Sequence, residues 1–169
     1  MMRNAGASRK LIREALPEIQ RHAQAIYIRG CPSLERKVCP GVRRLLSRLR
    51  NAGVPMGLVS GNFTRIGWKK VERAGLKAHF RMAAFGEMGK DRAALLRLSI
   101  RQARERGLIR AATRVAFVGD TPNDVRAARA NRVLAVAVST GLCSLEELEK
   151  ESPDVLLPDL RLMPLGMLV

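Results

Sequence analysis

Short apolar runs alternate with amphipathic stretches from residue 42 to residue 157, and this alternation most constrains the fold. Each apolar run is too short for a buried helix and is bounded by turn residues, as expected of a strand. Five runs fit this description: residues 56–60, 79–85, 115–118, 133–138 and 155–157. Since strands that alternate with helices favour a parallel sheet with right-handed crossovers, the pattern predicts a doubly wound α/β domain with helices on both faces.

The stretches between these runs have apolar residues at helical spacing, such as Val42, Leu45 and Leu49. They predict helices at residues 42–53, 64–74, 91–107, 123–130 and 144–147. Helical spacing also runs from Leu11 to Tyr27, with Pro17 placed to break or bend it, so this segment predicts two short helices or one bent helix.

The size and composition predict a single cytoplasmic domain. The chain has 169 residues, no apolar run of about 20 residues that could span a membrane, and no secretory signal. Its three cysteines, an odd number without a Cys-x-x-Cys pair, predict free thiols rather than a disulfide framework. Oligomeric state cannot be read from these features.

The formal charge of +16 raises the question of a nucleic-acid partner. From residue 111 onward the chain has six basic and eight acidic residues, so the whole excess lies earlier, on predicted helix faces. Such residues are typical of a solvated surface. Aromatic residues that could stack on bases are few and no nucleic-acid motif is present, which makes nucleic acid an unlikely partner and leaves a basic binding module as the third alternative below.

The segment from Val115 to Asp124 predicts part of a magnesium site. The apolar run ends in Gly119-Asp120, and Pro122 suits the first turn of a helix that would bring Asp124 back toward Asp120. Ligands of open α/β sheets bind at the carboxyl ends of the strands, and Mg²⁺ prefers carboxylate oxygens. The alternative interpretation is a cap-and-turn motif without metal, because Asp is a good helix N-cap.

Two other segments predict groups that bind phosphate. Ser60 ends the run at 56–60, where its hydroxyl and the backbone amides of Gly61 and Asn62, which follow it, could approach an anion. Lys90 and Arg92 begin the long helix, where a cation could neutralise a phosphate. Alternatively, Ser60 is an ordinary turn residue and the two cations decorate the surface.

Taken in order, these segments resemble the haloacid dehalogenase superfamily, and within it the hydrolases similar to phosphoglycolate phosphatase. The segments are Cys39-Pro-Gly-Val42, Gly57-Leu-Val-Ser-Gly-Asn62, Phe85-Gly86 with Asp91-Arg92, Gly119-Asp-Thr-Pro-Asn-Asp124, and Thr140-Gly141. The resemblance implies an α/β core at residues 39–169, a residual helical cap segment at residues 1–38, and a small phosphorylated metabolite as substrate. It also assigns phosphate binding to Ser60 and Mg²⁺ binding to Asp120 and Asp124. The cation of the family's third sequence motif would be Lys90 or Arg92.

One departure from the family pattern decides what the chain can do. The first motif, Asp-x-Asp at the end of a central strand, supplies the nucleophile and the general acid/base in this family, but the first Asp here is Asp91. Without it the chain should lack turnover, and its sheet should have a gap where that strand belongs. Three alternatives follow. In the first, the natural protein is longer and carries the strand. In the second, the chain is a non-catalytic remnant that binds anions or partners, and either the strands beside the gap pair directly or another chain fills it. In the third, the chain is a basic module that binds nucleic acid.

Overall fold

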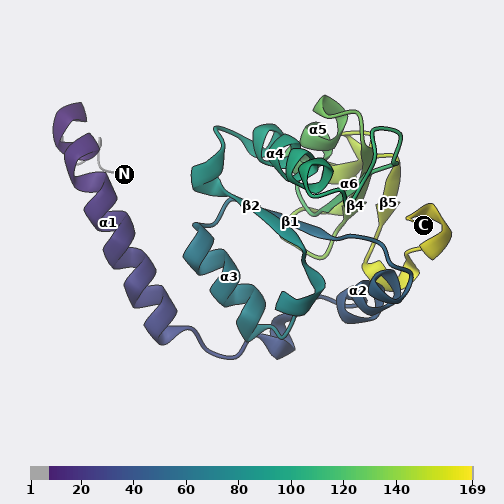
Figure 1. The fold of residues 1–169 in the computed structure, drawn as a ribbon, viewed down its shortest axis with the longest axis horizontal. Helices are drawn as coiled ribbons and strands as arrows, with labels where there is room; N and C mark the ends of the chain where they lie inside the picture. Colours follow the sequence, from purple (N-terminus) through teal and green to yellow (C-terminus); the bar gives the residue numbers. More distant parts are fainter. Residues whose placement is uncertain (1–7, 169) are drawn as a thin grey trace.

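The computed structural model describes residues 8–168 and has the α/β architecture that the sequence predicts, with parallel strands and helices on both faces (Figure 1). The helices are α1 (Arg9–Gly30), α2 (Val42–Asn51), α3 (Thr64–Arg73), α4 (Arg92–Glu105), α5 (Pro122–Ala130) and α6 (Leu145–Glu149). The strands are β1 (Gly57–Ser60), β2 (Met82–Phe85), β3 (Ala116–Gly119), β4 (Leu134–Val138) and β5 (Val155–Leu157). None of the helices within residues 8–168 combines the length and apolar character needed to cross a membrane.

The structure decides one prediction that the sequence left open and corrects the bounds of another. Helix α1 continues through Pro17 as one helix, with Ser8 as its N-cap. The strand predicted from residue 79 begins only at Met82, because His79 closes a 3-10 turn that its backbone N–H makes with the Leu76 carbonyl oxygen. The three cysteines are free, as expected.

The strands form two half-sheets rather than one continuous sheet. β1 pairs in parallel with β2, and β3, β4 and β5 form a second parallel group in that order. Within the described residues β1 and β3 do not pair with each other, so direct pairing of the strands that carry Ser60 and Asp120 does not occur. The sheet is therefore interrupted at the position where the sequence predicts a missing central strand.

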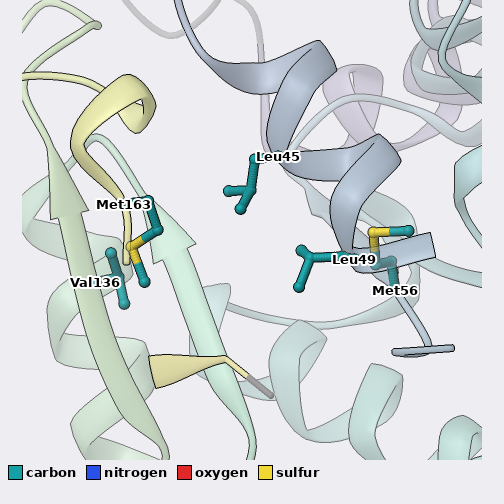
Figure 2. Close-up of a cluster of buried hydrophobic side chains, with 5 residues drawn as sticks. All are labelled: Leu45, Leu49, Met56, Val136 and Met163. Carbon is teal, nitrogen blue, oxygen red and sulfur yellow. The ribbon is translucent and has the colours of Figure 1, made fainter. Parts of the chain in front are cut away.

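Apolar side chains form two buried clusters, one on each face of β4. Val136 faces α2 and joins the cluster shown in Figure 2, which consists of Leu45, Leu49, Met56, Val136 and Met163. The neighbouring β4 residues face α5 and join the second cluster, Val125, Ala128, Ala135, Ala137 and Leu148. Alternate β4 residues thus point to opposite faces, as the pleat of a strand requires.

An apolar cavity of about 1190 Å³ occupies the interruption between β1 and β3. Its walls include residues 56–59 and 115–118 of the two strand segments, Leu45 and Leu49 of α2, and Leu96 of α4. We call this cavity the strand slot. It is bordered by a parallel strand on each side and by a helix on each face, which are the surroundings of a central strand in a doubly wound sheet.

Candidate active site

Ser60 lies at the carboxyl end of β1, in a turn that holds its hydroxyl oxygen. The Ser60 Oγ accepts hydrogen bonds from the Asn62 backbone N–H at 3.2 Å and from Asn62 Nδ2 at 2.9 Å. Both bonds use the hydroxyl as an acceptor, so its own proton is left to donate. The turn through Gly61 thus presents a donor at the strand end, as a phosphate-binding serine requires.

Lys70 of α3 lies beside this turn and is a cation that the sequence analysis did not predict at the site. Its Nζ donates to Asn62 Oδ1 at 2.9 Å and lies 5.4 Å from the centre of the Tyr27 ring of α1, a cation–π contact. Burial raises the pKa of the Tyr27 phenol, and the nearby Cys31 acts in the same direction. The sequence signal was slight: Lys70 lies two helical turns into the helix that follows the Ser60 turn.

Asp120 directly follows β3 and packs against the backbone of Gly141. The Asp120 carboxylate lies so close to Gly141 that a Cβ atom there would overlap it. Gly119 has the same relation to the carboxylate of Asp124, since a Cβ at Gly119 would overlap that group. Because glycine has no Cβ atom, both carboxylates can pack directly against the main chain of Gly119 and Gly141 at the carboxyl end of β3.

Asp124 lies in the first turn of α5 and is buried, with only 6% of its surface exposed. Its Oδ2 accepts hydrogen bonds from the Thr121 hydroxyl at 2.7 Å and the Thr121 backbone N–H at 3.2 Å, while the Thr121 hydroxyl accepts one from the Asp124 N–H. This reciprocal pair is a capping box, with Thr121 rather than an aspartate as N-cap. Asp124 thus has a capping role in the structure, and only Oδ1 points away from the cap.

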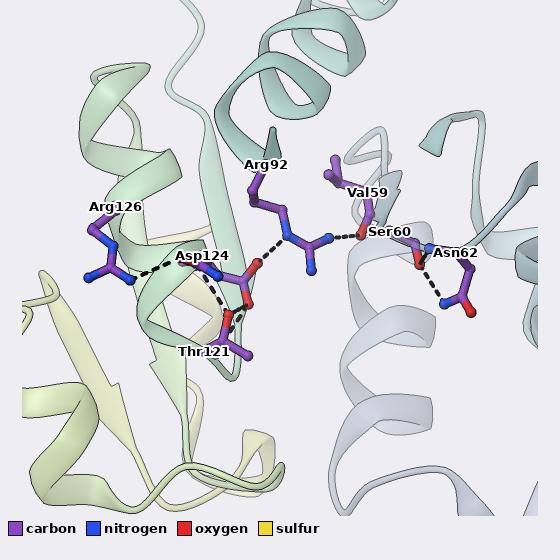
Figure 3. A network of polar contacts seen from close by, with 8 residues as sticks. Val59, Ser60, Asn62, Arg92, Thr121, Asp124 and Arg126 are labelled. Carbon is purple, nitrogen blue, oxygen red and sulfur yellow. Dashed lines mark hydrogen bonds and ion pairs between the residues drawn. The ribbon is translucent and has the colours of Figure 1, made fainter. Parts of the chain in front are cut away.

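Arg92 connects the two half-sheets across the carboxyl end of the strand slot (Figure 3). Its Nε lies 3.0 Å from Asp124 Oδ1, and its guanidinium donates to the Val59 carbonyl oxygen of β1 at 3.4 Å. Lys90 is exposed and has no such contact among those of the described residues. The structure therefore brings Arg92, and not Lys90, to the candidate site.

The donor chemistry of this strand end suits Mg²⁺. Asp120 and Asp124 offer hard carboxylate oxygens, and Mg²⁺ is usually held by one or two protein carboxylates, with water and substrate phosphate completing its ligands. Within residues 8–168 no group of three or more His, Cys, Asp or Glu side chains is gathered for a metal. The two acids are thus a partial ligand set.

Comparison with known proteins assigns this parallel sheet, with a serine and two acids at its strand ends, to one hydrolase family. The model of that family, haloacid dehalogenase-like hydrolase, matches residues 2–131. The chain therefore belongs to the haloacid dehalogenase-like hydrolases, which confirms the resemblance seen in the sequence.

Individual relatives agree with this assignment. The chain is 38% identical over 120 residues to a phosphoglycolate phosphatase of Synechococcus elongatus, covering 70% of this chain and 53% of the relative. It is 32% identical to one of Pseudomonas savastanoi, covering 78% of this chain and 47% of the relative. The chain thus spans about half the length of the curated relatives it matches.

The fold has counterparts among solved structures as well. A haloacid dehalogenase-like hydrolase of Streptococcus pneumoniae superposes with a TM-score of 0.65 at 19% identity, over 96% of this chain and 70% of that one. At this identity the likeness concerns the fold alone.

Proposed function

We propose that this chain contains the phosphate- and metal-binding residues of a Mg²⁺-dependent phosphomonoester hydrolase that acts on a small phosphorylated metabolite. The observation that carries the proposal is the arrangement of Ser60, Arg92 and Asp124 around one end of the strand slot. A hydroxyl that can donate a hydrogen bond to phosphate, a cation and an acid then surround the position where a central strand would end. The names of the relatives make phosphoglycolate the first substrate to test.

In this proposal each residue has one task. The Ser60 hydroxyl and the backbone amides of Gly61 and Asn62 bind the phosphate oxygens, and Arg92 offsets the negative charge that develops on them. Asp120 and Asp124 hold Mg²⁺, whose charge neutralises the substrate phosphate when it is bound. Lys70 fixes Asn62 and adds positive potential. The cap segment predicted at residues 1–38, of which residues 1–7 lie outside the described residues, is the remaining part of a helical cap over the substrate.

The nucleophile is the group that this chain does not supply. No Asp precedes Asp91 in the sequence, and the described residues around the slot present no other carboxylate pair at the end of a strand. Phosphoryl transfer through a covalent intermediate needs an activated nucleophile placed in line with the phosphate, and in this family the resemblance assigns that role to an aspartate. We therefore expect activity only when a strand ending in an acid fills the slot.

The test compares two proteins in a Mg²⁺-dependent assay with a generic phosphomonoester and with phosphoglycolate. One is the 169-residue chain, and the other is the same chain extended at its N-terminus by a segment whose strand ends in Asp-x-Asp. We expect turnover from the extended chain alone, and its loss in that chain when Asp120→Asn is added. Turnover by the 169-residue chain that Asp120→Asn abolishes would mean that another group serves as nucleophile.

The open slot favours a second candidate, a binding protein without turnover. Two parallel strands with a free edge each can accept a strand from another polypeptide, which is a known mode of peptide recognition. An extended chain that folds with a filled slot but hydrolyses no phosphomonoester would support this candidate over the enzyme.

A further inference from the structure

A second cavity, far from the candidate active site along the strands, is bordered by five arginines. It has a volume of about 580 Å³ and lies between α4, the loop before β3 and the turn from α5 to β4. We call it the arginine cavity, and its arginines are Arg97, Arg101, Arg104, Arg114 and Arg132. Since Val115 and Val133 precede their strands, this cavity lies at the amino ends of the strands, whereas Ser60 and Asp120 lie at the carboxyl ends.

The charge of this cavity is not balanced by its own walls. The described residues that line it include no Asp or Glu. The nearest pairing is Arg101 with Glu105 at 3.6 Å, on side chains that are 67% and 64% exposed, and such a surface pair contributes little. Gathering like charges in one concave site costs free energy that an anion would recover.

The helix dipole explains only a part of this cluster. Cations are favoured in the last turn of a helix, and in α4 that turn contains Arg104. Arg97 and Arg101 lie earlier in the helix, and Arg114 lies outside any helix. All five arginines of the cavity are exposed, so solvation of their side chains lowers the cost of gathering them, and the concave arrangement is what suggests a ligand.

The frame of the cavity is fixed before any ligand binds. Asn131 donates to the Ala93 carbonyl oxygen of α4 at 3.0 Å and to the Ala127 carbonyl oxygen of α5 at 2.8 Å, which ties the two helices together. Arg132 follows in a left-handed conformation with φ of 54°, which is uncommon for a residue other than glycine. A preorganised frame reduces the entropy lost on binding.

From these observations we infer that the arginine cavity binds a compact anion with three or more linked phosphate groups. Guanidinium groups match phosphate oxygens in paired hydrogen bonds, and several of them can grip successive phosphates. The volume is that of a small-molecule site. None of the described residues that line the cavity is aromatic, so a base would find no stacking surface there. A free oligophosphate and a nucleoside triphosphate should therefore bind alike.

The test is calorimetric titration of the full chain with tripolyphosphate and with ATP, at fixed salt and without Mg²⁺. The variant Arg97→Gln/Arg104→Gln/Arg114→Gln should bind tripolyphosphate at least about tenfold more weakly. The matched control Arg44→Gln/Arg48→Gln/Arg50→Gln removes the same charge from the exposed side of α2 and should change binding by no more than roughly twofold. Hydrogen exchange separates this site from the proposed phosphatase site, because an anion bound at the latter would protect residues 60–62 instead of the residues of the arginine cavity.

Hydrogen exchange of the unmodified chain gives a second measurement that does not depend on how the variants fold. Tripolyphosphate should protect residues 111–115 and 131–133. Equal losses in the two triple variants would refute the site, because binding would then follow net charge alone. A single-stranded RNA that binds the cavity more tightly than tripolyphosphate would also overturn the inference, in favour of a nucleic-acid surface, and so would preference for ATP by more than about tenfold.

Discussion

Replacing Arg92 and Asp124 singly and together tests whether their ion pair holds the two half-sheets together. The Nε and Oδ1 atoms lie 3.0 Å apart, and unit charges at that distance attract by about 5 kcal/mol at an effective dielectric constant of about 20. Desolvation cancels much of this, since the Asp124 side chain is only 7% exposed and the Arg92 side chain 28%. We therefore expect a net coupling free energy of about 1 to 3 kcal/mol.

The assay is urea unfolding of the unmodified chain, Arg92→Gln, Asp124→Asn and the double variant. Arg92→Gln should lower the free energy of unfolding by about 2 kcal/mol, or the melting temperature by roughly 4 to 8 °C, because a buried carboxylate loses its counter-ion while keeping the bonds from Thr121. A coupling below about 0.5 kcal/mol would refute the reasoning, since the pair would then behave like an exposed one.

Mg²⁺ extends this prediction to the proposed site. If Asp124 holds the metal, Oδ1 is shared between Mg²⁺ and Arg92, so saturating Mg²⁺ should reduce the measured coupling. A coupling that stays constant at all Mg²⁺ concentrations would count against Asp124 as a ligand and leave it with its capping role.

Three further predictions concern the core, the strand end and the C-terminal segment. Leu148→Ala should lower the free energy of unfolding by about 2 to 5 kcal/mol because Leu148 is 0% exposed, whereas the exposed control Leu142→Ala should stay within about 0.5 kcal/mol; chemical denaturation measures both. Gly141→Ala should cost about 1 to 3 kcal/mol and weaken Mg²⁺ binding, measured by denaturation and titration, while Gly30→Ala, which has open space, should do neither. Hydrogen bonds from Arg161 lower the pKa of Asp159. The ionised Asp159 therefore stabilises the fold fully above the unfolded pKa of about 3.9, and this contribution is lost as the pH falls through the folded pKa. Hydrogen exchange of the C-terminal amides should become faster relative to the unfolded chain over that pH range, and Asp159→Asn should not show this pH dependence.

The sequence predicts most of the fold because local patterns determine it. The runs at 115–118 and 133–138 are apolar and rich in valine, and the structure has strands within or beside those bounds. The strand predicted from residue 79 was too long, because composition alone does not show that His79 closes a 3-10 turn. Pro17 proved compatible with one long helix, an outcome that the sequence left open.

The contacts of the candidate site could be predicted only in part. A serine and an acid at strand ends follow from topology, since the carboxyl ends of parallel strands share one edge. The contact of Arg92 with Asp124 joins residues 32 positions apart on two half-sheets, and no local pattern encodes it. Which of Lys90 and Arg92 contacts Asp124 could therefore be seen only in the structure, and so could the contacts of Lys70.

The contacts of the candidate site are arranged around one end of the strand slot. The half-sheet that contains β1 and Ser60 and the half-sheet that contains β3, which Asp120 follows, lie on opposite sides of an apolar cavity. Arg92 bridges the two at the carboxyl ends of their strands. A strand inserted between β1 and β3 would pair with both edges and bury the apolar walls, and its last residue would arrive beside the Arg92 guanidinium. An acid at that position would then compete with Asp124 for the arginine. Filling the slot would thus complete the sheet and, by the same step, release Asp124 toward a metal, so folding and assembly of the proposed site are coupled through one ion pair.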